Sequence, residues 1–169
     1  MPQFCANLTL MFNEVPFPER FAAAAKAGFK GVEYLFPYDF PKEQLADLLA
    51  QHKLRQVLHN MPGFYLNYTQ QALDIIRDTG VDNLYVQYDI YHMQIMEGDL
   101  APTIEKHLAM IPHMQLADTP GRHEPGTGEI NYPFLFDCID KLGYQGWIGC
   151  EYKPLTTTGA GLDWIKPYL

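Results

Sequence analysis

Short apolar runs rich in β-branched and aromatic residues alternate along this 169-residue chain with amphipathic segments of helical spacing. That alternation is typical of βαβ units, which build a mostly parallel sheet covered by helices. The sequence therefore predicts an α/β fold with a mostly parallel sheet of about six strands and alternating helices. The expected strands are residues 3–10, 31–36, 54–59, 83–91, 113–117 and 146–152, and the expected helices are residues 18–27, 41–52, 70–80, 100–109, 132–142 and 162–169.

The composition fits one globular domain that spans residues 1–169. Hydrophobic residues make up 47% of the chain and charged residues 19%, which is the balance of an ordinary folded protein. The formal net charge of −8 repels phosphate backbones and anionic membrane surfaces. We therefore expect neither nucleic acid nor a membrane as a partner.

The cysteines and the N-terminal segment bear on the compartment. Cys5, Cys138 and Cys150 form no C-x-x-C spacing, so we expect small buried apolar residues in a reducing environment. The first 20 residues lack the basic and apolar regions of a signal peptide, and no apolar run reaches the length of a membrane span. These features predict a cytoplasmic protein.

Polar residues close four of the expected strands, and this is the end at which parallel α/β sheets place their sites. Asp89, Gln115 and Glu151 carry oxygen donors of the kind that Mg²⁺ or Mn²⁺ prefers. Helix capping or loop hydrogen bonding is the alternative for each of them. The other polar residues at or just after these strand ends are His59, Asn60, His92, Asp118 and Lys153.

Three long motifs, DIYHMQ, PGRHEPGTGEINYP and GCEYKP, closely resemble those of the hydroxypyruvate isomerase family, which belongs to the xylose-isomerase-like TIM barrels. The resemblance covers nearly the whole chain as two blocks. It implies a metal-assisted aldose–ketose isomerisation of hydroxypyruvate to tartronate semialdehyde (2-hydroxy-3-oxopropanoate), or of a related small sugar acid, through an ene-diolate. The implied cofactor is Mg²⁺ or Mn²⁺.

The resemblance also implies that part of the barrel is absent. A TIM barrel typically takes about 250 residues, whereas here the LHN motif at residues 58–60 runs directly into MPGFYLN at residues 61–67. The fourth and fifth βα-regions of the family have no counterpart, and the two blocks join near residues 60–61. We expect a shortened TIM-barrel-like fold.

Site roles follow from the resemblance. Asp89, Gln115 and Glu151 match three of the family's four metal ligands, and Glu151 is also a catalytic proton carrier there. The fourth ligand, a Glu on the family's fifth strand, is missing, so impaired activity is expected. Glu33 lies within an expected strand and is interpreted as structural. The residues expected at the substrate are His59, His92, Arg122 and Lys153.

Two rival functions remain. The missing Glu favours a catalytically inactive shortened barrel that acts as an oligomerising or binding protein. A DNA-repair nuclease of the same superfamily is disfavoured by the charge and by too few His residues for a zinc cluster. Because an incomplete barrel leaves unpaired strand edges, self-association is expected, most simply as a homodimer.

Overall fold

The computed structural model describes residues 2–35, 39–56 and 68–169. Within them, helices separate the six parallel strands along the chain, as the apolar periodicity predicts, with two helices in succession between the fourth and fifth strands. The strands are β1 (Gln3–Asn7), β2 (Gly31–Glu33), β3 (Arg55–Gln56), β4 (Gln87–Asp89), β5 (His113–Leu116) and β6 (Trp147–Cys150). The helices are α1 (Phe17–Lys26), α2 (Lys42–His52), α3 (Thr69–Thr79), α4 (Ile90–Met96), α5 (Leu100–His107) and α6 (Tyr132–Lys141), with 3₁₀ turns η1 (Leu108–Met110) and η2 (Asp163–Tyr168).

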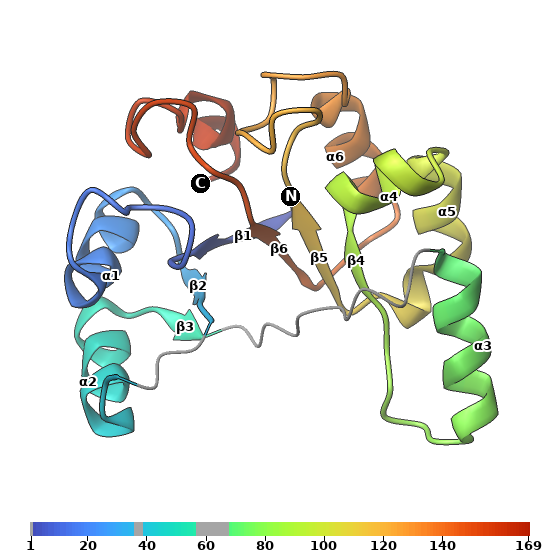
Figure 1. Ribbon diagram of the computed structural model, residues 1–169, viewed down its shortest axis with the longest axis horizontal. Coiled ribbons are helices and arrows are strands. Elements are labelled where there is room, and N and C mark those ends of the chain that lie inside the picture. Colours follow the sequence, from blue (N-terminus) through green and yellow to red (C-terminus); the bar gives the residue numbers. More distant parts are fainter. Residues whose placement is uncertain (1, 36–38, 57–67) are drawn as a thin grey trace.

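Among the described residues the sheet is open, with the strand order β3-β2-β1-β6-β5-β4 and parallel pairing throughout. The first and last strands pair with each other at its centre, as they do in a closed barrel. The two edges are β3 and β4, the strands expected to flank the missing region. Figure 1 shows the strands along an arc with α1 and α2 outside one half and α5 and α6 outside the other.

The register sorts the strand side chains into two faces. Cys5 pairs with Gly31 and Gly149, and Gly149 pairs with Gln115. Since side chains alternate along a strand and paired residues share a face, the odd-numbered strand residues all lie on one face. The even-numbered face is apolar and buried, as with Phe4 on β1. The odd-numbered face is polar, which is the unusual feature of this sheet.

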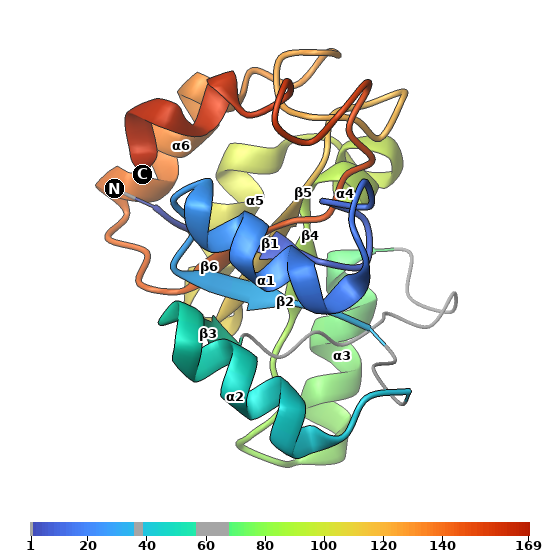
Figure 2. The same ribbon diagram turned by 90° about the vertical axis from the view of Figure 1, so that its left-hand side faces the viewer.

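Aromatic residues fill the layer between the sheet and the helices. The Phe4 ring lies 5.1 Å from that of Phe136 on α6 and 5.4 Å from that of Trp164 on η2. Figure 2 shows η2 beside α6, near both ends of the chain. This packing joins the N-terminal strand to the last segment of the chain. It leaves the opposite, polar face free to form a site.

Several boundaries differ from those expected. The strand expected over residues 83–91 stops at Asp89, and Ile90–Met96 forms α4, because the Asp89 side chain accepts a hydrogen bond from the His92 N–H and caps a helix there. The helix expected from residue 70 begins one residue earlier, at Thr69, as α3. The last segment is a 3₁₀ helix with Pro167 inside it rather than an α-helix. Among the described helices, none is both long and apolar enough to cross a membrane.

Candidate functional site

Three adjacent strands bring the predicted metal ligands to the same end of the same face. Asp89 and Gln115 are register partners at the ends of β4 and β5. Gln115 is also the partner of Gly149 on β6, and Glu151 follows two residues later with the same parity. All three side chains are buried. Their oxygen donors suit a hard divalent cation, so the residues fit the group that the sequence predicts.

Asp89 and His92 act as a pair at the start of α4. One carboxylate oxygen of Asp89 accepts from the His92 backbone N–H at 3.2 Å, and the other lies 3.5 Å from His92 Nε2. The His92 ring is about half exposed. The structure therefore brings this predicted substrate residue directly beside a predicted ligand.

The Gln115 amide is held in one orientation. Its Oε1 accepts from Gln87 Nε2 at 2.6 Å, and its Nε2 donates to Glu33 Oε1 at 3.1 Å. The amide oxygen therefore faces the β4 side of the sheet, where Asp89 lies, while the amide nitrogen faces β2. A residue that binds a metal needs its donor oxygen held in one orientation in this way.

Arg122 reaches Glu151 from the long loop after β5. Its Nη2 donates to Glu151 Oε2 at 2.6 Å, and its guanidinium lies 5.2 Å from the centre of the Tyr91 ring. The backbone of Arg122 has a φ of 55° and is fixed on both sides. Its N–H donates to the Asp118 carbonyl, and its carbonyl accepts from the Lys153 N–H. Lys153 thus contributes backbone contacts, and its side chain is exposed.

Asp118 orders this loop instead of facing the site. Its two carboxylate oxygens accept hydrogen bonds from four backbone N–H groups, those of Thr119, Gly126, Gly128 and Ile130. A carboxylate has about four acceptor sites, and these four N–H groups occupy those of Asp118. Asp118 also holds Arg122 in place within the loop, since its backbone carbonyl accepts from the Arg122 N–H.

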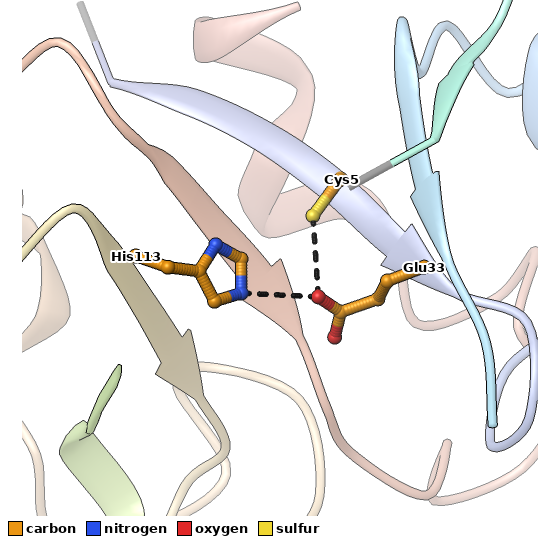
Figure 3. A group of neighbouring side chains, drawn as sticks. All are labelled: Cys5, Glu33 and His113. Atoms are coloured by element: carbon orange, nitrogen blue, oxygen red, sulfur yellow. Dashed lines mark hydrogen bonds and ion pairs between the residues drawn. The ribbon is translucent and has the colours of Figure 1, made fainter. Parts of the chain in front are cut away.

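The sequence interpretation missed a polar cluster deeper on the same face. Glu33 is fully buried at the end of β2, and four side chains from β1 and β5 donate to it: Cys5, Asn7, His113 and Gln115. Figure 3 shows Cys5 and His113 pointing at the same Glu33 oxygen. The sequence does contain a sign of this cluster. Cys5 and Asn7 on β1 alternate with apolar residues, and so do His113 and Gln115 on β5.

The cysteines differ from one another. Cys150 belongs to the apolar core, as expected, whereas Cys5 lies in the polar cluster and Cys138 is only half-buried. Burial, and to a smaller extent the nearby Glu33 charge, raises the pKa of the Cys5 thiol well above its usual range. Cys5 is therefore a protonated donor to Glu33 at neutral pH. His59 and Asn60 lie outside the described residues, as does the junction near residues 60–61.

Known proteins match this chain along almost its full length. The family model for the xylose isomerase-like TIM barrel matches residues 43–168. Hydroxypyruvate isomerase of Escherichia coli (strain K12) is 36% identical over 257 aligned residues, covering 99% of this chain and 100% of that protein. The 2-oxo-tetronate isomerase of Cupriavidus necator is 34% identical over 258 residues, covering 100% and 99%. Both alignments are far longer than the 169 residues present, so a substantial part of each relative has no counterpart here.

A solved structure has a fold very similar to that of this chain. The crystal structure of AP endonuclease, family 2, from Brucella melitensis superposes with a TM-score of 0.95 at 34% identity, covering 99% of each chain. The arrangement of strands and helices described above is therefore also that of this solved structure.

Proposed function

The chain belongs to the xylose isomerase-like TIM barrel family, and we propose that it isomerises a small keto-acid such as hydroxypyruvate or 2-oxo-tetronate. The observation that carries this proposal is the convergence of Asp89, Gln115 and Glu151 on one strand-end face, with Arg122 beside them. Both named relatives act as isomerases on substrates of this class.

A divalent cation, Mg²⁺ or Mn²⁺, would be held by Asp89, Gln115 and Glu151. When bound, it supplies a Lewis acid that stabilises charge on two adjacent substrate oxygens. The chain's own contribution is the preset donor geometry. Gln87 fixes the Gln115 oxygen, and the α4 N-terminus orients Asp89.

Arg122 is the group that suits the substrate carboxylate. A guanidinium has five N–H donors, so the bond to Glu151 leaves others free for a carboxylate. The same bond holds Glu151 in place to carry a proton between neighbouring carbons. His92, half exposed beside Asp89, lies where it can donate to a substrate oxygen.

Turnover is expected to be low because the second carboxylate is missing. Loss of one acid–base group typically costs about 10²- to 10⁴-fold in rate. Glu33 cannot substitute for it, since four donors hold its carboxylate within the sheet. Either Glu151 moves the proton alone, or His59 takes this role.

A titration of Mn²⁺ followed by calorimetry tests the ligand assignment. We expect one weak site in the wild type and a clear loss of affinity in Glu151→Gln, because an anionic ligand is removed. Leu155→Ala, at an exposed position beyond β6, is a matched control that should bind as the wild type does. Equal binding by the wild type and Glu151→Gln would overturn the role of Glu151.

The open edges support a proposal about assembly. In the described part of the chain, β3 and β4 each have one strand neighbour, and Thr69 is the only buried residue of the amphipathic helix α3. Leu84 and Tyr85, just before β4, are also exposed. A second copy of this chain is the simplest cover for such a surface, so we expect a homodimer.

The rival functions are less well supported. A purely structural role would not need Arg122 and Glu151 preset at one site, yet both are held by several contacts. A nuclease role is suggested by the name of the Brucella structure, but the net charge of −8 opposes binding to a phosphate backbone. The reducing environment expected from the cysteines points to a cytoplasmic enzyme.

A further inference from the structure

Three potential ligand atoms converge in the buried cluster below the proposed keto-acid site. Glu33 Oε2 lies 3.6 Å from Cys5 Sγ and 3.1 Å from His113 Nε2 (Figure 3). All three atoms lie within 4.8 Å of one another, and all three residues are buried. They come from β2, β1 and β5, so a ligand bound there would join three strands.

The Glu33 carboxylate divides its two oxygens between different partners. Oε1 accepts from the side-chain amides of Asn7 and Gln115, at 3.0 and 3.1 Å. Oε2 faces the Cys5 thiol and the His113 ring. A carboxylate held by outer hydrogen bonds on one oxygen is well placed to bind a metal through the other.

The separations match a tetrahedral metal site. With Zn–S near 2.3 Å and Zn–N and Zn–O near 2.0–2.1 Å, ligand atoms lie about 3.3–3.6 Å apart. The sulfur–oxygen separation of 3.6 Å fits, and the nitrogen–oxygen separation of 3.1 Å needs to open by a few tenths of an ångström. We propose that Cys5, Glu33 and His113 form a buried zinc site that is separate from the proposed keto-acid site.

The chemical nature of the three side chains determines which metal ion the site prefers. A thiolate, an imidazole and a carboxylate favour Zn²⁺ or its substitute Co²⁺, whereas Mg²⁺ and Mn²⁺ prefer oxygen donors alone. Binding would release the thiol proton of Cys5 to solvent and leave the neutral His113 ring with its proton on Nδ1. A water would complete the tetrahedron.

Two features around the zinc site affect it: Gly149 leaves space for the Glu33 carboxylate, and the surroundings of the His113 ring lower the affinity for zinc. A Cβ on Gly149 would lie 2.6 Å from Glu33 Oε1, so the glycine makes room for the carboxylate. His113 Nδ1 is buried and has no hydrogen-bond partner among the described residues. Since that outer bond typically contributes about 10- to 100-fold in metal affinity, the affinity should be lower than that of a complete structural zinc site.

Cobalt spectroscopy of the full chain tests this proposal. Co²⁺ added to the metal-free protein should produce a thiolate charge-transfer band in the near ultraviolet, and Zn²⁺ should abolish it. Cys5→Ser should lack the band. Cys150→Ser, a change at another buried cysteine on the adjacent strand, and Cys138→Ser should both retain it. Absence of the band in the wild type, or its survival in Cys5→Ser, would overturn the site.

Two further measurements separate this site from the proposed keto-acid site and from misfolding. Asp89→Asn should weaken Mn²⁺ binding and leave the cobalt band intact, whereas Cys5→Ser should do the reverse. Added Zn²⁺ should also raise the melting temperature of the wild type but not of Cys5→Ser, because a ligand stabilises only the form that binds it. An equal Zn²⁺-induced rise in both proteins would contradict the proposal.

Discussion

Arg122 Nη2 donates to Glu151 Oε2 at 2.6 Å, and Arg122 Nε lies 3.5 Å from the Glu151 carbonyl oxygen. This contact joins the long loop after β5 to the end of β6. The Glu151 side chain is almost completely buried and that of Arg122 about two-thirds buried, so water screens the pair only partly. A loop residue thereby becomes a fixed part of the proposed site.

Changing Arg122 to Lys should weaken substrate binding more than it slows the chemical step. A lysine keeps the charge but lacks the planar guanidinium, whose several N–H groups can bind Glu151 and a substrate carboxylate at the same time. Loss of one charge-assisted hydrogen bond costs about 1.5–3 kcal/mol, equivalent to about 10- to 150-fold in kcat/KM. Steady-state kinetics should show most of this loss in KM. An unchanged KM would argue against a contact with the substrate carboxylate.

Removing the Asp118 side chain should destabilise the whole loop. Asp118→Ala strands four backbone N–H groups, for which we expect a loss of about 3 kcal/mol. For a domain of this size that corresponds to a melting temperature lower by about 6–12 °C. Glu129→Ala, at an exposed position of the same loop, is the matched control and should change little. Calorimetric melting of the three proteins checks this, and equal melting of wild type and Asp118→Ala would refute the role.

The order of elements follows from the sequence because each strand and most helices carry their own periodicity. The 83–91 segment shows the limit of that signal. Its apolar residues run on past Asp89, and only the capping contact with His92 shows that the chain turns into α4 there. The two sheet edges were predictable from the missing βα-regions, since removing two strands of a barrel leaves their former neighbours unpaired.

Of the candidate site, only the residues that lie within the long sequence motifs could be predicted. Asp89, Gln115 and Glu151 lie at strand ends within long motifs, so both position and resemblance point to them. Glu33 was interpreted as structural, and its partners were not foreseen. Cys5 and His113 are 108 positions apart in the sequence, and only the β1–β6–β5 register shows that they share a face.

The contact between Glu14 and Thr158 should make stability depend on acid pH. Burial alone would raise the Glu14 pKa, but hydrogen bonds from the Thr158 N–H and hydroxyl, together with the Glu14 backbone N–H and the Arg20 charge, outweigh it and lower the pKa below 4.5. A lowered pKa stabilises the fold above the unfolded value, and this contribution is lost as the pH falls through the folded value.

Glu14→Gln should therefore be less stable than the wild type at neutral pH. The difference between the two should shrink as the pH falls below about 4.5. Denaturant melts across this range measure it. Glu43→Gln, which removes an exposed carboxylate on α2, controls for the change in net charge. A pH-independent gap for Glu14→Gln would show that the contact does not contribute in this way.

Self-association should depend on the β4 edge. Light scattering at micromolar concentration should give about twice the 19.4 kDa of one chain. Tyr85→Lys, beside the edge, should shift the protein towards monomer because an edge charge opposes strand pairing. Leu155→Lys alters an equally exposed apolar residue elsewhere and should remain dimeric. A clean monomer for the wild type would show that the edges are covered within one chain.

Turnover of hydroxypyruvate in the presence of Mn²⁺ or Mg²⁺ tests the central proposal most directly, measured side by side for the wild type, Glu151→Gln and the E. coli hydroxypyruvate isomerase. The proposal predicts a slow reaction by the wild type, about 10²- to 10⁴-fold below the full-length relative, and none by Glu151→Gln. A wild-type rate no higher than that of Glu151→Gln would contradict it and leave an assembly or binding role as the better description.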